Sequence, residues 1–144
     1  MTELDQIEED LAALSEQIPV LFRDFYARLY AAHPHTQVCF GSGSMVPRKQ
    51  MLNQMLSAVH DHARGEDWLP EYLAGMSTLH HDWDVTACMY DALVESLIAA
   101  LGANLGPSWN AEGERVWRAH LDAICQRMKT HGTGAPDPWW AGEE

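Results

Sequence analysis

The spacing of apolar residues along this 144-residue chain constrains its fold more than any other feature. In the first segment, Leu4, Ile7, Leu11, Leu14 and Ile18 recur at intervals of three and four, and acidic residues fill much of the space between them. Such a pattern places one apolar stripe along one face of an α-helix. No segment alternates apolar and polar residues convincingly, as a half-buried strand would. The sequence therefore predicts an all-α fold.

Proline and glycine residues divide this pattern into separate helices. Pro19, Pro47 and Pro70 suit the first turn of a helix, where the backbone needs no donor, and Gly102 or Gly106 can end the most apolar segment. The connections are not tight hairpins, which favours crossed helices over a simple up-down bundle. About seven helices are expected, the long ones over residues 4–18, 19–32, 47–64, 68–81, 85–102 and 108–129.

The length of the chain predicts one domain with one hydrophobic core, which we place at residues 1–131. The segment 132–144 is rich in glycine and proline and is expected to be an irregular C-terminal tail. Trp139 and Trp140 are unusual in such a tail. Either packing onto the domain or a crystal or dimer contact would explain them.

The charge of the chain argues against some classes of partner. Twenty-one acidic residues against nine basic ones give a net charge of −12, whereas nucleic acids and anionic membranes need a positive surface.

No apolar run approaches the ~20 residues of a membrane helix, and the acidic N-terminus lacks the basic and apolar segments of a signal peptide. The three cysteines are far apart and form neither a disulfide framework nor a zinc motif. We therefore expect a cytoplasmic monomer or homodimer with no nucleic-acid or membrane partner.

Two adjacent histidines, His80 and His81, stand near the end of one predicted helix. At ~100° per residue, His80 falls in the apolar stripe of Leu69 and Met76, whereas His81 turns toward the polar side. An inward histidine is most often a hydrogen-bonded core residue, and the alternative is a ligand to a group in a cavity. The two histidines and the aspartates after them point in different directions, so they do not form a local metal site.

The helix that follows Pro47 has a similar arrangement. Arg48, Leu52 and Met55 share one apolar stripe with Arg48 at its end, whereas Gln50 points nearly the opposite way. Two helices therefore each present an apolar stripe with one polar side chain at its end. An apolar cleft with a few placed polar groups is typical of a site for a flat organic cofactor.

Two stretches of the chain resemble a known family. "FYARLYAAHPHTQVCF" resembles the part of bacterial single-domain globins and flavohaemoglobins that spans their distal tyrosine and the phenylalanine at the haem edge. "LHHDWDVTACMYDALVESLIAALG" resembles the stretch that begins at their proximal histidine. In that family a valine and a tyrosine follow this histidine after five and ten residues. Val85 and Tyr90 have these offsets from His80 and not from His81.

A third stretch, "AEGERVWRAHLDAICQRM", resembles the last globin helix, with Trp117 near its start. The resemblance covers about residues 5–130. It implies the globin fold, a three-on-three sandwich of helices around haem, with iron as the bound metal.

The resemblance also implies roles for the matching residues. His80 would be the axial ligand of the iron in haem b, and Tyr26 would point its hydroxyl at the bound gas. The distal polar residue would be Arg48 by helical phase, which we prefer, or Gln50 by its distance from Phe40. The other cofactor contacts would be Phe40 on the porphyrin, Leu52 on the distal face, Met76 and Val85 on the proximal side, and Tyr90 beside the proximal histidine.

The chain departs from flavohaemoglobins in two respects. Their last helix carries a glutamate that acts with the tyrosine to make the proximal imidazole more basic. Counted from Trp117, the matching position here is Gly132, with His131 beside it. We also expect no flavin or nicotinamide domain, so turnover that needs electrons would require a separate reductase.

The expected function is reversible binding of oxygen, or of carbon monoxide or nitric oxide, as in oxygen transport. A second hypothesis is a nitric oxide dioxygenase or peroxidase-like haem enzyme that uses a separate reductase. A third is a haem-free globin-like module for sensing or protein contact, which His80 on an apolar stripe disfavours.

Overall fold

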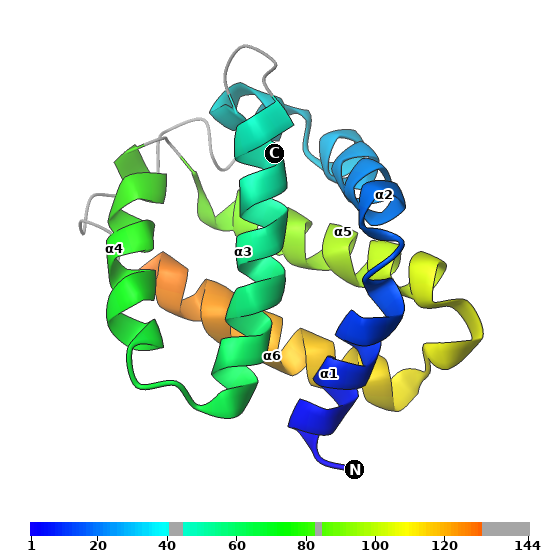
Figure 1. Cartoon of the computed structure of the whole chain (residues 1–144). Helices are drawn as coiled ribbons and strands as arrows, with labels where there is room; N and C mark the ends of the chain where they lie inside the picture. The colour runs from blue at the N-terminus through cyan, green and yellow to red at the C-terminus, as the bar shows by residue number, and fades with distance from the viewer. Residues whose placement is uncertain (41–44, 83–84, 131–144) are drawn as a thin grey trace.

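The structure, a computed structural model, describes residues 1–40, 45–82 and 85–130 (Figure 1). No strand occurs in these ranges, so the predicted all-α fold is confirmed. The predictions for His131, Gly132, Trp139 and Trp140 fall outside the described residues. The elements in chain order are α1 (Glu3–Leu14), α2 (Ile18–Ala32), the 3-10 helix η1 (Pro34–Phe40), α3 (Met45–Arg64), α4 (Leu69–Asp82), α5 (Ala87–Leu105), the 3-10 turn η2 (Gly106–Ser108) and α6 (Ala111–Thr130).

The first two helices meet at a short break near Pro19. Helix α1 begins with a capping box, in which the Asp5 amide donates to the Thr2 hydroxyl at 3.0 Å and the Thr2 amide to the Asp5 carboxylate at 2.9 Å. It ends at Leu14, four residues earlier than predicted. In a continuous helix the ring of Pro19 would clash with the preceding turn, so the apolar stripe continues into a new helix that has Pro19 in its first turn.

Helix α5 runs three residues past Gly102, so Gly106 is the correct one of the two predicted ends. Gly106 has φ +56°, which an L side chain rarely adopts. Gly102 lies inside the helix under the indole of Trp109. A Cβ there would come within 3.1 Å of that ring, so the glycine permits close packing.

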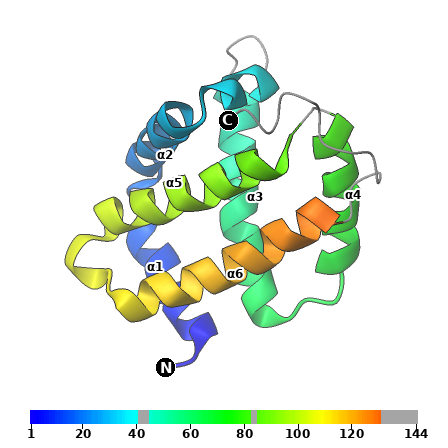
Figure 2. The same ribbon diagram turned by 180° about the vertical axis from the view of Figure 1, so that it is seen from behind.

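The helices form two crossed groups. Helices α3 and α4 stand side by side in Figures 1 and 2, and α5 and α6 cross them. Helix α2 packs on α5, and α1 packs on both α3 and α6. The expectation of crossed helices is therefore confirmed.

Helix α5 is the most buried of these elements. Nine of its residues, including Val94, Leu97 and Leu101, are buried among the other helices. By length and apolar composition alone, the stretch Ala87–Ser108 could cross a membrane, although half of its most apolar window is buried inside the protein. Core helices have the same composition, because all of their faces meet other helices.

Helix α4 is fixed to α6 by a buried polar contact. The Ser77 hydroxyl, 1% exposed, donates to the backbone carbonyl of Met128. Leu69 and Leu73 on the same helix are buried in the core. These contacts set the orientation of α4 about its axis, and with it the direction of His80.

Candidate functional site

A cavity of about 110 Å³ lies among α3, α4, α5 and α6. Most of its wall is apolar, and five of the seven methionines of the chain line it. The lining residues are Leu29, Thr36, Cys39, Met51, Gln54, Met55, Ala58, Tyr72, Leu73, Met76, His80, Val85, Met89, Tyr90, Leu93, Ile124, Cys125 and Met128.

His80 is the imidazole in this wall. Its Nδ1 lies 2.7 Å from the backbone carbonyl oxygen of Met76, one turn earlier on α4. Because a carbonyl only accepts, Nδ1 carries the proton, and a neutral ring then has its lone pair on Nε2. Burial lowers the pKa of His80 below its ordinary value, which favours this neutral form at pH 7. The ring therefore has the protonation state of a metal ligand. His81 does not line the cavity.

Three other residues expected near His80 lie with it in the cavity wall: Met76, Val85 and Tyr90. The amide of Val85 donates to the carbonyl of His80 at 3.0 Å. The rings of His80 and Tyr90 are 6.3 Å apart between centroids. Burial raises the pKa of Tyr90 well above its ordinary value, so the phenol stays protonated. The structure thus brings together the predicted proximal set.

The predicted distal residues lie elsewhere. The Tyr26 hydroxyl donates to the backbone carbonyl of Arg48 at 2.7 Å. The Arg48 guanidinium lies 6.0 Å from the ring centroids of Phe22 and Tyr26 and bonds to the side chain of Tyr30. Neither Tyr26 nor Arg48 lines the cavity.

The remaining predicted contacts also lie off the cavity wall. Leu52 is 1% exposed within the core, and Gln50 is exposed. Phe40 is the last residue of η1, and its side chain is outside the described part of the structure. The roles assigned to these residues stay predictions.

The face of α3 that lines the cavity is formed by Met51, Gln54, Met55 and Ala58. The helical wheel selected the stripe of Arg48, Leu52 and Met55, of which Met55 lines the cavity and Leu52 packs in the core. Helix α3 is apolar on both faces, so periodicity alone did not separate them. The spacing of Met51 and Met55, one turn apart, was the available signal.

The side chains of the cavity wall that could bind a metal suit a metal held in an organic cofactor. In the described residues, no three His, Cys, Asp or Glu side chains gather where they could hold a metal ion. One imidazole does not hold a bare ion, but it suffices for an iron whose other ligands come from a tetrapyrrole. The apolar wall of the cavity also suits such a flat cofactor.

The crossed helices surround an apolar cavity whose wall contains one histidine, His80. The family model Globin matches residues 23–128, more than half of the chain and every residue in the cavity wall. The chain belongs to the globin family, and its fold is the all-α globin fold. A search of curated proteins finds no match to it. Membership supports a protein that binds haem and a gas, while the closer likeness to flavohaemoglobins stays a prediction.

Proposed function

We propose that this globin holds haem b through His80 and binds oxygen, carbon monoxide or nitric oxide reversibly at the haem iron. The observation that carries the proposal is the state of His80. Its ring lines an apolar cavity, and its Nδ1 proton is engaged by the Met76 carbonyl at 2.7 Å. The neighbouring carbonyl fixes the tautomer and the plane of the ring, as the outer contacts of metal-bound histidines do.

The iron, when bound, supplies the coordination site for the gas. The protein's own residues hold the cofactor and exclude water. Val85 and Leu93 on the loop and helix after His80 present apolar atoms to the cavity, and Met76 covers the adjacent wall. Apolar surroundings of this kind strengthen the few polar contacts made inside them.

Two residues are candidates for the hydrogen bond to the gas. Gln54 lines the cavity from α3 and carries an amide that donates. Tyr26, the residue favoured by the family resemblance, has one hydroxyl proton, which the Arg48 carbonyl accepts. Tyr26 would therefore have to leave Arg48 to reach a ligand, whereas Gln54 need not leave the cavity wall. We propose that Gln54 is the residue that donates a hydrogen bond to the bound gas.

Haem titration of two matched variants tests the proposal. His80→Ala should lose haem or most of it, because it removes the axial nitrogen, while the adjacent His81→Ala should keep a normal Soret band. Circular dichroism of both apoproteins controls for folding. Equal haem uptake by the two variants, or loss only in His81→Ala, would contradict the assignment.

A further inference from the structure

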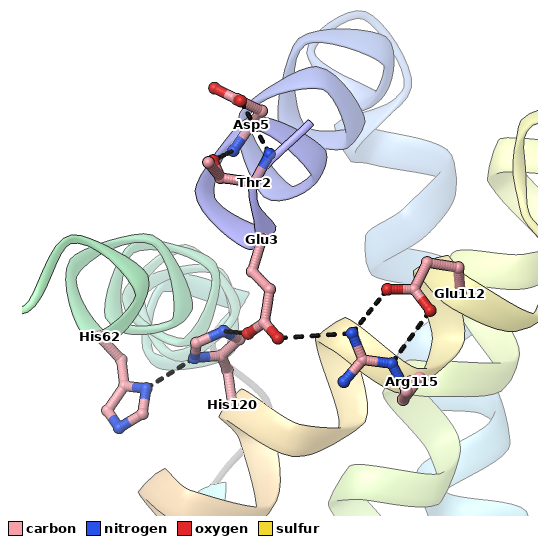
Figure 3. A network of polar contacts seen from close by, with 7 residues as sticks. All are labelled: Thr2, Glu3, Asp5, His62, Glu112, Arg115 and His120. Carbon is pink, nitrogen blue, oxygen red and sulfur yellow. Dashed lines mark hydrogen bonds and ion pairs between the residues drawn. The ribbon is translucent and has the colours of Figure 1, made fainter.

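Two imidazoles from different helices face each other away from the cavity. His62 lies near the end of α3 and His120 lies on α6 (Figure 3). Their Nδ1 atoms are 2.7 Å apart, and their ring centroids are 4.9 Å apart. Neither ring lines the cavity. Imidazole nitrogens are common ligands of zinc, copper and nickel ions, so the pair offers two such ligands at one point.

The Glu3 carboxylate sets the tautomer of His120. One of its oxygens lies 2.9 Å from Nε2 of His120. Because an ionised carboxylate only accepts, Nε2 carries the proton, and Nδ1 of the neutral ring has the lone pair. A carboxylate that accepts the far N–H of an imidazole is the usual outer contact of a metal-bound histidine, since it fixes the ring and raises the basicity of the ligating nitrogen. His120 is therefore oriented as such a ligand, with its lone pair toward His62.

His62 can supply the second lone pair. Burial, then His120 and Arg127, lower the pKa of His62, so the ring is neutral at pH 7 and an ion does not have to displace a whole proton from it. In the contact with His120 its Nδ1 donates, so this proton must move to Nε2 when an ion binds. The ring is half-buried, and water can reach it for that exchange.

The distance between the two nitrogens suits ligands at a right angle. Two nitrogens ~2.0–2.1 Å from one ion are about 2.9 Å apart at a right angle and about 3.3 Å apart at the tetrahedral angle. The observed 2.7 Å is closer to the first value. Right angles are the preference of Cu²⁺ and Ni²⁺, whereas zinc prefers the tetrahedron. Small turns of both rings, from facing head-on to converging, would admit the ion.

The surroundings leave room for water as the other ligands. No third His, Cys, Asp or Glu side chain joins the pair within the ranges that the structure describes. The charge of Arg115 is already balanced, because it binds both Glu112 and Glu3. Arg127 opposes a cation, and the net charge of −12 on the chain favours one.

We infer that His62 and His120 form a binding site for a divalent ion of the copper and nickel type, with Glu3 as the residue that positions His120. The site joins α3 to α6 and does not depend on haem, because none of the three residues lines the cavity. An ion that binds the folded chain in this way also stabilises it.

The test titrates Ni²⁺ into the full-length protein by calorimetry at pH 7.5. The wild type and His81→Gln, a matched control outside the pair, should bind with the same affinity. Loss of an outer contact typically costs ~10–100-fold in metal affinity, so His62→Gln, which loses a ligand, should bind at least about tenfold more weakly. Glu3→Ala, which loses the outer contact, should also bind about tenfold more weakly or worse. Circular dichroism controls for folding.

Two further measurements locate the ion. Paramagnetic Ni²⁺ should broaden the ring signals of His62 and His120 first in NMR spectra, and it should raise the urea midpoint of the wild type but not of His62→Gln. Mg²⁺, which prefers oxygen ligands, should shift neither ring. Equal Ni²⁺ affinities of the wild type and His62→Gln, or earlier broadening of other histidines, would overturn the site. An unchanged affinity in Glu3→Ala would contradict the part assigned to Glu3.

Discussion

At the scale of the residue, Tyr26 is the tyrosine expected to face the bound gas, but its hydroxyl binds the backbone of α3 instead. The ring is buried at 3% exposure, and its hydroxyl links α2 to the Arg48 carbonyl in the first part of α3. Burial raises the pKa of Tyr26 well above its ordinary value, so the group acts as a donor throughout the physiological range.

Replacing this hydroxyl should affect stability more than gas binding. Tyr26→Phe removes one hydrogen bond and should lower the free energy of unfolding by about 1 kcal/mol in urea titrations. Oxygen and carbon monoxide should dissociate at rates close to those of the wild type. A rise specific to oxygen of about ten- to a hundredfold would instead show that the hydroxyl leaves Arg48 for the ligand, since a bond to a charged acceptor is worth roughly 1.5–3 kcal/mol.

At the scale of the element, a polar network joins the end of α3 to α6 and α1 (Figure 3). Nδ1 of His62 lies 2.7 Å from Nδ1 of His120, whose Nε2 lies 2.9 Å from the Glu3 carboxylate. Arg115 binds Glu3 at 3.4 Å and Glu112 at 2.5 Å. One imidazole must donate and the other accept, so the contact between them is lost when both rings are fully protonated.

This network should make stability depend on pH. Burial, then His120 and Arg127, lower the pKa of His62, so the folded protein protonates this ring less readily than the unfolded chain does. Its contribution is therefore complete above the unfolded pKa of ~6.5 and declines as the pH falls from there toward the lower folded value. Urea unfolding about one pH unit on either side of ~6.5 measures the decline.

A pair of variants assigns the effect to the network. His62→Gln should weaken the dependence of the unfolding free energy on pH. The number of protons taken up on unfolding should fall by less than one, because the ring is partly exposed and solvent screens it. His81→Gln on α4, outside the network, should leave the dependence as in the wild type. Identical pH profiles for the wild type and His62→Gln would refute the role of this contact.

At the scale of the whole molecule, the cavity ties stability to its occupant. A pocket of about 110 Å³ with an apolar wall leaves the side chains around it without close neighbours on one side until it is filled. A ligand that binds only the folded chain stabilises it by mass action, by roughly 4 kcal/mol at ~1,000 times its Kd. Haem should therefore raise the unfolding midpoint of the wild type strongly and that of His80→Ala only slightly. Thermal unfolding with and without haem measures both, and equal midpoints in the wild type would contradict the prediction.

Much of this architecture follows from the sequence alone. Apolar spacing determined the helices, because a helix of this kind buries one stripe and the period of that stripe is local. Helical phase also separated His80 from His81, and the structure places His80 and not His81 in the cavity wall. Proline and glycine located most ends, including that of α5 at Gly106, although the break after Leu14 differed from the prediction.

The orientation of α3 about its axis was decided only by tertiary structure. Two of its faces are apolar, and the sequence treats them alike. Packing of α3 against α1 and α6 turns Leu52 into the core and leaves Met55, from the same predicted stripe, at the cavity with Met51 and Gln54. The same rotation brings the Arg48 carbonyl to Tyr26. The spacing of apolar residues indicates which faces of a helix can be buried. Which neighbouring helix covers each face depends on side chains far away in the chain.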